Sequence, residues 1–140
     1  MPIVPGDWQQ MVRECHPDDL HHWHARWRDI DWSATLAQPH WHLITDGQGS
    51  WCLIEPVNGS AQHREGHLII APHRRGKAGL VIARDMLVWI EAHGIASLIA
   101  NAHDRATALF LRWLGFGATE GKTMVMRFDS GPSEEQPSRS

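Results

Sequence analysis

The stretch HLIIAPHRRGKAGLVIARDMLVWI, from His67 to Ile90, decides the fold. It opens with a short apolar run that contains the β-branched pair Ile69-Ile70 and stops at Pro72. A basic turn that carries glycine follows, and a long apolar segment of helical character comes after the turn. These three segments predict a strand, a turn and a helix in that order.

The turn from Arg74 to Gly79 reads Arg-Arg-Gly-Lys-Ala-Gly and is the strongest chemical signal in the chain. Successive backbone N–H groups at the start of a helix carry partial positive charge and have no partner within the helix. Together with neighbouring cations they form a site that suits phosphate. We therefore expect a phosphate-bearing ligand at this turn, and an ordinary solvated turn is the alternative.

The segment resembles motif A of the GNAT superfamily of acetyl-coenzyme A dependent N-acetyltransferases. In that motif a strand ending in V-x-P is followed by a turn close to R-G-x-G-x-G/A, which opens a helix. The matching residues are Ile70, Pro72, Arg75 and Gly76. Ala78 and Leu80 stand where the family usually has its second and third small residues, and Gly79 lies between them.

A second block, DRATALFLRWLGF from Asp104 to Phe116, is similar to the family's N-x-x-A-x-x-x-Y-x-x-x-G-F helix and turn. The order and spacing of the two blocks agree with the family, and together they cover roughly residues 40 to 128. The resemblance implies an α/β fold with a mixed, largely antiparallel twisted sheet flanked by helices. The short form, the turn and the second block resemble the GNAT-like proteins of tailed phages and prophages more than metabolic members.

Length and composition favour one domain, because 140 residues with 42% apolar content suffice for one continuous core. We expect this domain to span residues 1–128. Residues 129–140 offer no apolar side chain and are expected to form a disordered tail.

Charge and cysteine usage narrow the partners and the compartment. A net charge of −3 and a pI near 6.4 do not favour nucleic acid as a partner. The chain has two cysteines, Cys15 and Cys52, which are too few for a disulfide scaffold. We therefore expect the protein in a reducing cytoplasm, which is the host cytoplasm if the protein is phage-encoded. We expect no signal peptide and no membrane span, because Arg84 and Asp85 interrupt the most apolar segment.

Hydrophobic periodicity and turn signals place the remaining elements. Apolar spacings of three and four from Leu20 to Ile30 are helical, and Asp46-Gly47-Gln48-Gly49 is a hairpin signal. The expected helices are 7–14, 17–29, 78–93 and 104–114. The expected strands are 41–45, 50–55, 63–71, 96–101 and 123–128. The crossover helix between 63–71 and 96–101 makes that strand pair parallel.

The resemblance implies that acetyl-CoA lies with its pyrophosphate over the amides of residues 75–80 and its pantetheine arm beside the strand that ends at Ala71. The residues expected to contact it are Ile70, Ala71, Arg74, Arg75, Gly76, Lys77, Ala78, Gly79, Leu80, Asn101 and Asp104.

The resemblance also implies direct attack of an amine on the acetyl thioester. A lysine-like ammonium has a pKa of about 10.4 and must first lose a proton. Glu65 and His67 point to the same face of their strand by its two-residue period, so either is a candidate base. His63 and Glu55 are further candidates. The family's usual general acid is a Tyr that aligns with Leu111, and the chain contains no Tyr.

A second cluster, Cys15, His16, His21, His22 and His24, has the residue types of zinc ligands. His21 and His24 share a helix face, yet the cluster contains neither a C-x-x-C nor an H-x-x-x-H pair. We expect a polar helix face there and no metal site.

These observations favour an acetyl-CoA dependent N-acyltransferase. Its amine acceptor is left open among a lysine side chain, a protein N-terminus, a polyamine and a small drug-like amine. The alternative is a catalytically degenerate GNAT-fold protein that binds or inhibits a host protein. The sequence leaves the oligomeric state open.

Overall fold

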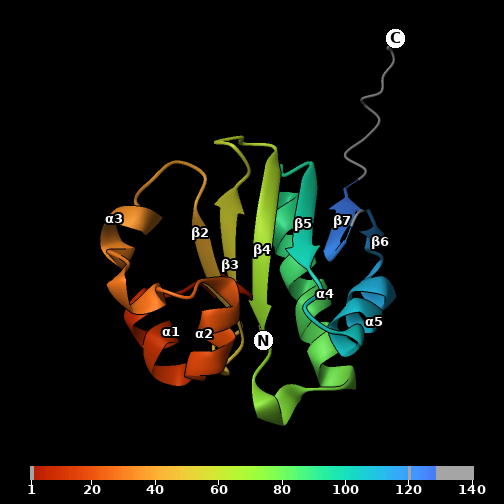
Figure 1. Ribbon diagram of the computed structural model, residues 1–140, viewed down its shortest axis with the longest axis horizontal. Helices are drawn as coiled ribbons and strands as arrows, with labels where there is room; N and C mark the ends of the chain where they lie inside the picture. Colours follow the sequence, from red (N-terminus) through yellow and green to blue (C-terminus); the bar gives the residue numbers. More distant parts are fainter. Residues whose placement is uncertain (1, 120, 129–140) are drawn as a thin grey trace.

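The computed structural model describes residues 2–119 and 121–128. Its centre is a seven-stranded sheet with the order β1-β2-β3-β4-β5-β7-β6 (Figure 1). The strands are β1 (Val4–Pro5), β2 (His42–Thr45), β3 (Trp51–Pro56), β4 (His63–Ile69), β5 (Ser97–Asn101), β6 (Gly117–Ala118) and β7 (Thr123–Arg127). The helices are α1 (Trp8–Glu14), α2 (Pro17–Trp23), α3 (Trp32–Leu36), α4 (Lys77–Ala92) and α5 (Arg105–Leu114), with 3-10 turns η1 (Trp27–Asp29) and η2 (Pro72–Arg74).

The sheet is mixed and largely antiparallel, as expected. β4 and β5 form its parallel pair, with α4 as the crossover between them, and the other neighbouring strands run antiparallel. Figure 1 shows both β4 and β5 pointing toward the same edge of the sheet, where η2 and the start of α4 lie.

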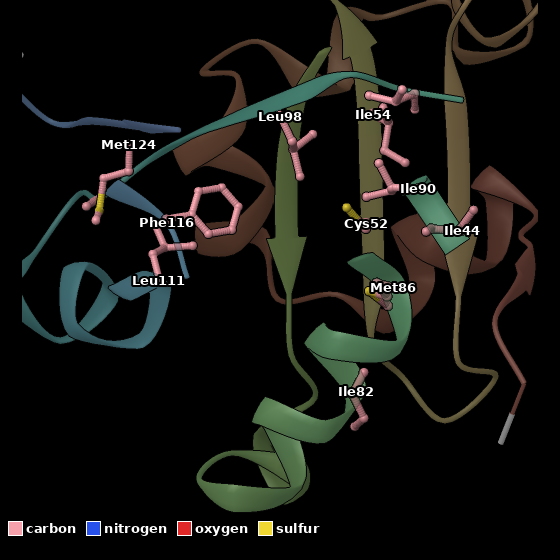
Figure 2. Close-up of a cluster of buried hydrophobic side chains, with 12 residues drawn as sticks. Ile44, Cys52, Ile54, Ile82, Met86, Ile90, Leu98, Leu111, Phe116 and Met124 are labelled. Atoms are coloured by element: carbon pink, nitrogen blue, oxygen red, sulfur yellow. The ribbon is translucent and has the colours of Figure 1, made fainter. Parts of the chain in front are cut away.

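Successive side chains along β2 and β3 point to opposite faces of the sheet and so contribute to two separate hydrophobic cores, one on each face. On one face Ile44, Cys52 and Ile54 pack with residues of α4 and α5. Figure 2 shows this cluster, in which Ile82, Met86 and Ile90 project from successive turns of α4 toward the strands.

The second core lies on the opposite face, where Leu43, Trp51 and Leu53 pack against the three N-terminal helices. Those helices contribute Met11, Leu20 and Trp32, and the 3-10 turn η1 adds Trp27. Six of the eight tryptophans belong to this core: Trp27, Trp32 and Trp51 are buried in it, and Trp8, Trp23 and Trp41 pack against it.

The expected helix 17–29 is wrong in its second half. α2 ends at Trp23 because His24 adopts an extended backbone, and a separate 3-10 turn follows at Trp27–Asp29. The Nδ1 atom of His24 accepts a hydrogen bond from the Arg26 amide, which stabilises the break. The short elements β1, α3 and β6 were not expected from the sequence, and the expected tail at 129–140 lies outside the described residues.

The helix boundaries read from caps are confirmed for α5. The Asp104 side chain accepts a hydrogen bond from the Thr107 amide at the start, and Gly115 adopts a left-handed conformation at the end.

Cys15 and Cys52 are both buried and unpaired with each other, and burial raises the pKa of each thiol to about 12. Within the described residues, no helix combines the length and apolar character needed to cross a membrane.

Met86 offers a test of the α4 core, since its side chain is 1% exposed at the centre of the first cluster. Met86→Ala should lower the free energy of unfolding by about 2–5 kcal/mol, because it removes buried methylenes and leaves a cavity. Val88→Ala on the exposed side of the same helix should change it by less than about 0.5 kcal/mol. Urea denaturation of both variants measures the difference, and equal losses would contradict the packing of α4 described above.

Candidate active site

The parallel strands β4 and β5 pair through three positions and then separate. The paired residues are His63 with Ser97, Arg64 with Leu98, and Glu65 with Ile99. β4 continues to Ile69, so its edge from Gly66 to Ile69 has no β5 partner in the described structure. Unpaired strand edges offer N–H and C=O groups to an extended ligand. The separation therefore suits a ligand that lies along β4.

Two carboxylates and an imidazole meet where the strands separate. Glu55 on β3 stands directly opposite Glu65 on β4, and His67 lies two residues further on the same face. The Nε2 atom of His67 is 3.2 Å from Glu55 Oε2 and 3.8 Å from Glu65 Oε2. The exposed fractions of the three side chains are 17% for His67, 25% for Glu55 and 23% for Glu65, so solvent reaches them only partly.

Each carboxylate has its own neutral hydrogen-bond donor. The indole Nε1 of Trp23, the last residue of α2, donates to Glu55 Oε2 over 3.1 Å. The Nδ2 atom of Asn101, the last residue of β5, donates to Glu65 Oε2 over 3.1 Å. Asn101 is held in turn by Thr123 of β7, whose hydroxyl donates to Asn101 Oδ1 over 3.3 Å. Four strands and one helix thus fix the cluster.

The surroundings push the pKa values of the two carboxyl groups in opposite directions. Burial alone would raise the pKa of Glu55, but hydrogen bonds from His67 and Trp23 and the charges of His67 and His24 hold it below its usual range. The pKa of Glu65 is raised, first by burial and then by the charge of Glu55, against a lowering by His67. Such a split is typical of sites in which one carboxyl group moves a proton while the other stays ionised.

Glu55, Glu65 and His67 each offer one ligand atom, and these atoms lie within 4.8 Å of one another. Among the described residues this is the one set of three or more such side chains close enough to hold a metal ion. The histidines near α2 do not converge with Cys15. His16 caps α2, His22 stacks on His103 with ring centroids 4.4 Å apart, and Cys15 is buried.

The basic turn leads from β4 into α4 and presents free backbone amides. Gly76 takes φ 91° and ψ −140°, a conformation that residues with a Cβ rarely adopt. No side chain caps the helix, so the amides at its first turn, beginning at Lys77, are open to an anion. Lys77 and Ala78 are exposed there. The local geometry fits the phosphate site expected from the sequence.

The two arginines of the turn have different surroundings. Arg75 donates from Nε to the Ile70 carbonyl over 3.3 Å, and its Nη2 is 3.9 Å from Asp19 of α2. Arg74 instead lines a hollow of about 300 Å³ together with the acids Asp46 and Asp85. This hollow shares Arg74 and Ala78 with the turn, but its lining includes none of the residues of the carboxylate cluster.

Several other expected cofactor contacts have structural roles. Gly79 is buried, and a Cβ there would lie 3.0 Å from the Arg74 carbonyl oxygen and 3.2 Å from Ile70, so glycine permits close packing of helix and strand. The Ala71 amide donates to Ser50 Oγ over 2.9 Å and is not free for a ligand. Leu80 is half-buried.

Near the second motif, Asp104 and Leu111 also support the fold. Asp104 is exposed and caps α5, and hydrogen bonds from Thr107 hold the pKa of its carboxyl group low. Leu111 is 6% exposed and packs in the first core with Phe116 and Met124, which Figure 2 shows beside it. Position 111 thus contributes apolar packing where the family has its Tyr.

The structure brings together Glu65, His67 and Asn101 from the expected site residues and adds Glu55 and Trp23. Glu55 was a minor candidate, and its importance lies in the β3–β4 register, which places it opposite Glu65. In the sequence, this register is indicated by the turn at residues 56–62, because the length of the connection between β3 and β4 sets which residues lie opposite each other. The contact of Trp23 with Glu55 spans 32 residues and crosses from a helix to a strand, and no local pattern predicts it.

The fold resembles that of solved acetyltransferases. The structure of the Salmonella typhimurium protein YncA with its cofactor acetyl-CoA matches with a TM-score of 0.62 and 15% identity, over 92% of this chain and 94% of that one. A ribosomal-protein-alanine N-acetyltransferase from Brucella melitensis matches with a TM-score of 0.62 and 14% identity, over 91% and 100%. The aminoglycoside acetyltransferase AAC(6')-Ib in complex with coenzyme A gives 0.61 and 12%, over 90% and 94%.

No protein-family model and no curated protein sequence matches the chain. At these low identities the likeness is one of fold, and it shows that the chain has the fold of the GNAT N-acetyltransferases. The expected phage origin and cytoplasmic location stay predictions.

Position 111 can be tested directly, because Leu111 is enclosed by the first core. Leu111→Tyr should lower the free energy of unfolding by about 1–3 kcal/mol, since a larger ring with a polar oxygen must fit a closely packed site. Leu109→Tyr is the matched control, as Leu109 is 42% exposed on the same helix. Thermal or urea denaturation compares them, and an unchanged Leu111→Tyr would show that the site has room for a phenol.

Proposed function

We propose that the protein is an acetyl-CoA dependent N-acyltransferase in which Glu65 accepts the proton of the amine. The observation that carries this proposal is the position of Glu65, a half-buried carboxyl group of raised pKa at the point where β4 and β5 separate. The GNAT-type fold supports the reaction class.

The residues present fit acetyl-CoA. Open amides at the start of α4, with Lys77 beside them, would hold the pyrophosphate. The unpaired edge of β4 from Gly66 to Ile69 would hold the extended pantetheine arm. When bound, the co-substrate supplies an acetyl thioester whose carbonyl carbon forms the new C–N bond while its C–S bond breaks.

Proton movement is the task of the carboxylate cluster. A protonated amine must lose one proton before it attacks and a second one afterwards, so the base must pass protons on to solvent. Glu65 suits this role because its raised pKa brings it closer to neutral pH and because 23% of its side chain is exposed. His67 lies 3.8 Å away and stabilises the ionised form of Glu65.

The departing thiolate takes its proton from water in this scheme, since the chain has no Tyr and position 111 is an apolar core residue. A thiol of ordinary pKa near 8.5 gives a tolerable leaving group. The expected result is a slower transfer than one assisted by a general acid, which typically contributes about 10²–10⁴-fold.

The acceptor is an amine, on a protein or on a small molecule. The similar structures include one acetyltransferase named for aminoglycosides and one named for a ribosomal-protein alanine, so the shared fold is compatible with both classes. Incubation of the purified protein with acetyl-CoA and a lysate, followed by intact-mass and acetyl-peptide analysis, distinguishes them.

A second candidate function is protein binding by a catalytically degenerate member of this fold. Leu109 and Trp113 favour it, because both lie one turn apart on α5 with 42% and 64% of their surface exposed. A biological effect that persists without acetyl-CoA and disappears in Trp113→Ala would support this function over the enzyme.

Binding of acetyl-CoA is the first test of the enzyme. The unmodified protein should bind it in calorimetry, and Lys77→Glu should weaken binding roughly tenfold or more, because it reverses a charge beside the phosphate site. Arg84→Glu makes the same charge change on an exposed face of α4 about two turns away and should leave binding nearly intact. Lys77→Glu tests the charge alone, whereas Gly76→Glu would also strain the backbone, because position 76 has a positive φ. Absence of binding to the unmodified protein would remove the enzyme proposal.

The base is tested by Glu65→Gln, which keeps the size of the side chain and removes its proton affinity. Acetyl transfer should fall by roughly 10²–10⁴-fold, while acetyl-CoA affinity stays the same, because proton removal matters only on the path to the transition state. Steady-state kinetics and calorimetry measure the two quantities. Full transfer by this variant would exclude Glu65 as the base.

A further inference from the structure

We propose that Glu55 is a positioning residue for the transfer reaction: it holds the Nε2 proton of His67 and so leaves Glu65 free to accept the proton of the amine. This inference rests on the proposed function, which by itself requires only Glu65. It assigns a distinct task to each of the two carboxylates in the cluster and a tautomer to the imidazole between them.

The tautomer follows from the chemistry of the contacts. An ionised carboxylate only accepts hydrogen bonds, so the 3.2 Å contact between His67 Nε2 and Glu55 Oε2 requires a proton on Nε2. Glu65 Oε2 is 3.8 Å from the same nitrogen, beyond hydrogen-bonding distance. A neutral imidazole has one N–H to donate, and this geometry gives it to Glu55.

Glu55 is itself held firmly. Its Oε2 atom also accepts from Trp23 Nε1 over 3.1 Å, and the Trp23 ring packs against Trp32 and edge-on against His67, with centroids 4.9 and 5.7 Å apart. Trp32 is buried in the second core. Two donors on one oxygen and a rigid aromatic wall keep Glu55 ionised and in place.

Glu65 keeps free lone pairs by contrast. Its hydrogen-bond donor is the neutral amide of Asn101. The titratable groups that act on Glu65 are Glu55 from β3 and His67 from β4. His63, also on β4, contacts Ser97 of β5 through its Nδ1 atom, and His24, which follows α2, acts on Glu55. Removal of Glu55 would let the His67 proton turn to Glu65 and would make Glu65 a weaker base.

The pH dependence of kcat/KM gives the first readout, because its acidic limb reports the pKa of the base in the free enzyme. Glu55→Gln should move this limb to lower pH, since Glu65 loses a neighbouring negative charge and gains the His67 donor. It should also reduce kcat/KM at neutral pH, because Glu65 becomes a weaker base. His67→Phe should move the limb to higher pH, because Glu65 loses the neighbour that lowers its pKa.

Glu14→Gln is the matched control. Glu14 accepts a hydrogen bond from an indole as Glu55 does, with 3.0 Å between Trp51 Nε1 and Glu14 Oε1, but it lies on α1 outside the cluster. This variant should leave the limb and the rate unchanged. An equal shift in Glu14→Gln and Glu55→Gln would reduce the role of Glu55 to general stability.

The ring nitrogens of His67, observed by long-range ¹H–¹⁵N NMR, give a readout that does not depend on activity. The unmodified protein should show the Nε2–H tautomer. Glu55→Gln and Glu65→Gln should each keep it, because the remaining carboxylate still accepts from Nε2, whereas the double variant Glu55→Gln with Glu65→Gln should populate both tautomers. If Glu55→Gln does not fold, Glu55→Asp replaces it: this variant keeps the charge but shortens the side chain by one methylene, which weakens the contact with His67 Nε2 and should also turn the proton toward Glu65.

The outcomes separate this inference from the proposed function. An Nδ1–H tautomer in the unmodified protein, or an unmoved limb in Glu55→Gln, would overturn the role of Glu55 while Glu65 remains the base. Absence of acetyl transfer in the unmodified protein would overturn both, even where the tautomer is as expected.

Discussion

The parallel pairing of β4 with β5, and its end after three residue pairs, is the constraint on which the site depends. Parallel strands need a crossover, and α4 supplies it from the point where β4 ends. The same crossover brings the open amides of the turn near the unpaired strand edge. The separation also ends the β4–β5 pairing at Glu65, and beyond that point the Asn101 side chain of β5 donates a hydrogen bond to the Glu65 carboxylate.

The two faces of the sheet divide the tasks. The face toward α4 carries an apolar core that includes Ile82, Met86 and Ile90, and this packing fixes the helix and hence the direction of its first amides. The opposite face carries a tryptophan-rich core, and the carboxylate cluster lies at its edge. Trp23 connects the two features, since its ring packs into that core while its Nε1 donates to Glu55.

The sequence predicted what local patterns encode. The five longer strands, the parallel pair and the caps Asp104 and Gly115 all follow from periodicity and turn chemistry, and the structure confirms them. The site was predicted in part, because the two-residue period places Glu65 and His67 on one face. The break of the expected helix after Trp23 and the contact of Trp23 with Glu55 depend on tertiary packing, so local periodicity carried no signal for them.

Two glycines of the basic turn, Gly76 and Gly79, have different structural roles. Gly79 was expected to contact acetyl-CoA, but in the structure its missing Cβ allows the Arg74 carbonyl and Ile70 to pack closely against α4. Gly76 is the residue whose backbone conformation needs glycine, since it turns the chain from β4 into the helix. The departure at Ala78 should therefore cost little for the proposed phosphate binding, because its exposed methyl group lies beside amides that the Gly76 conformation orients. The match at Gly76 bears more on the proposed cofactor site than the count of glycines in the turn.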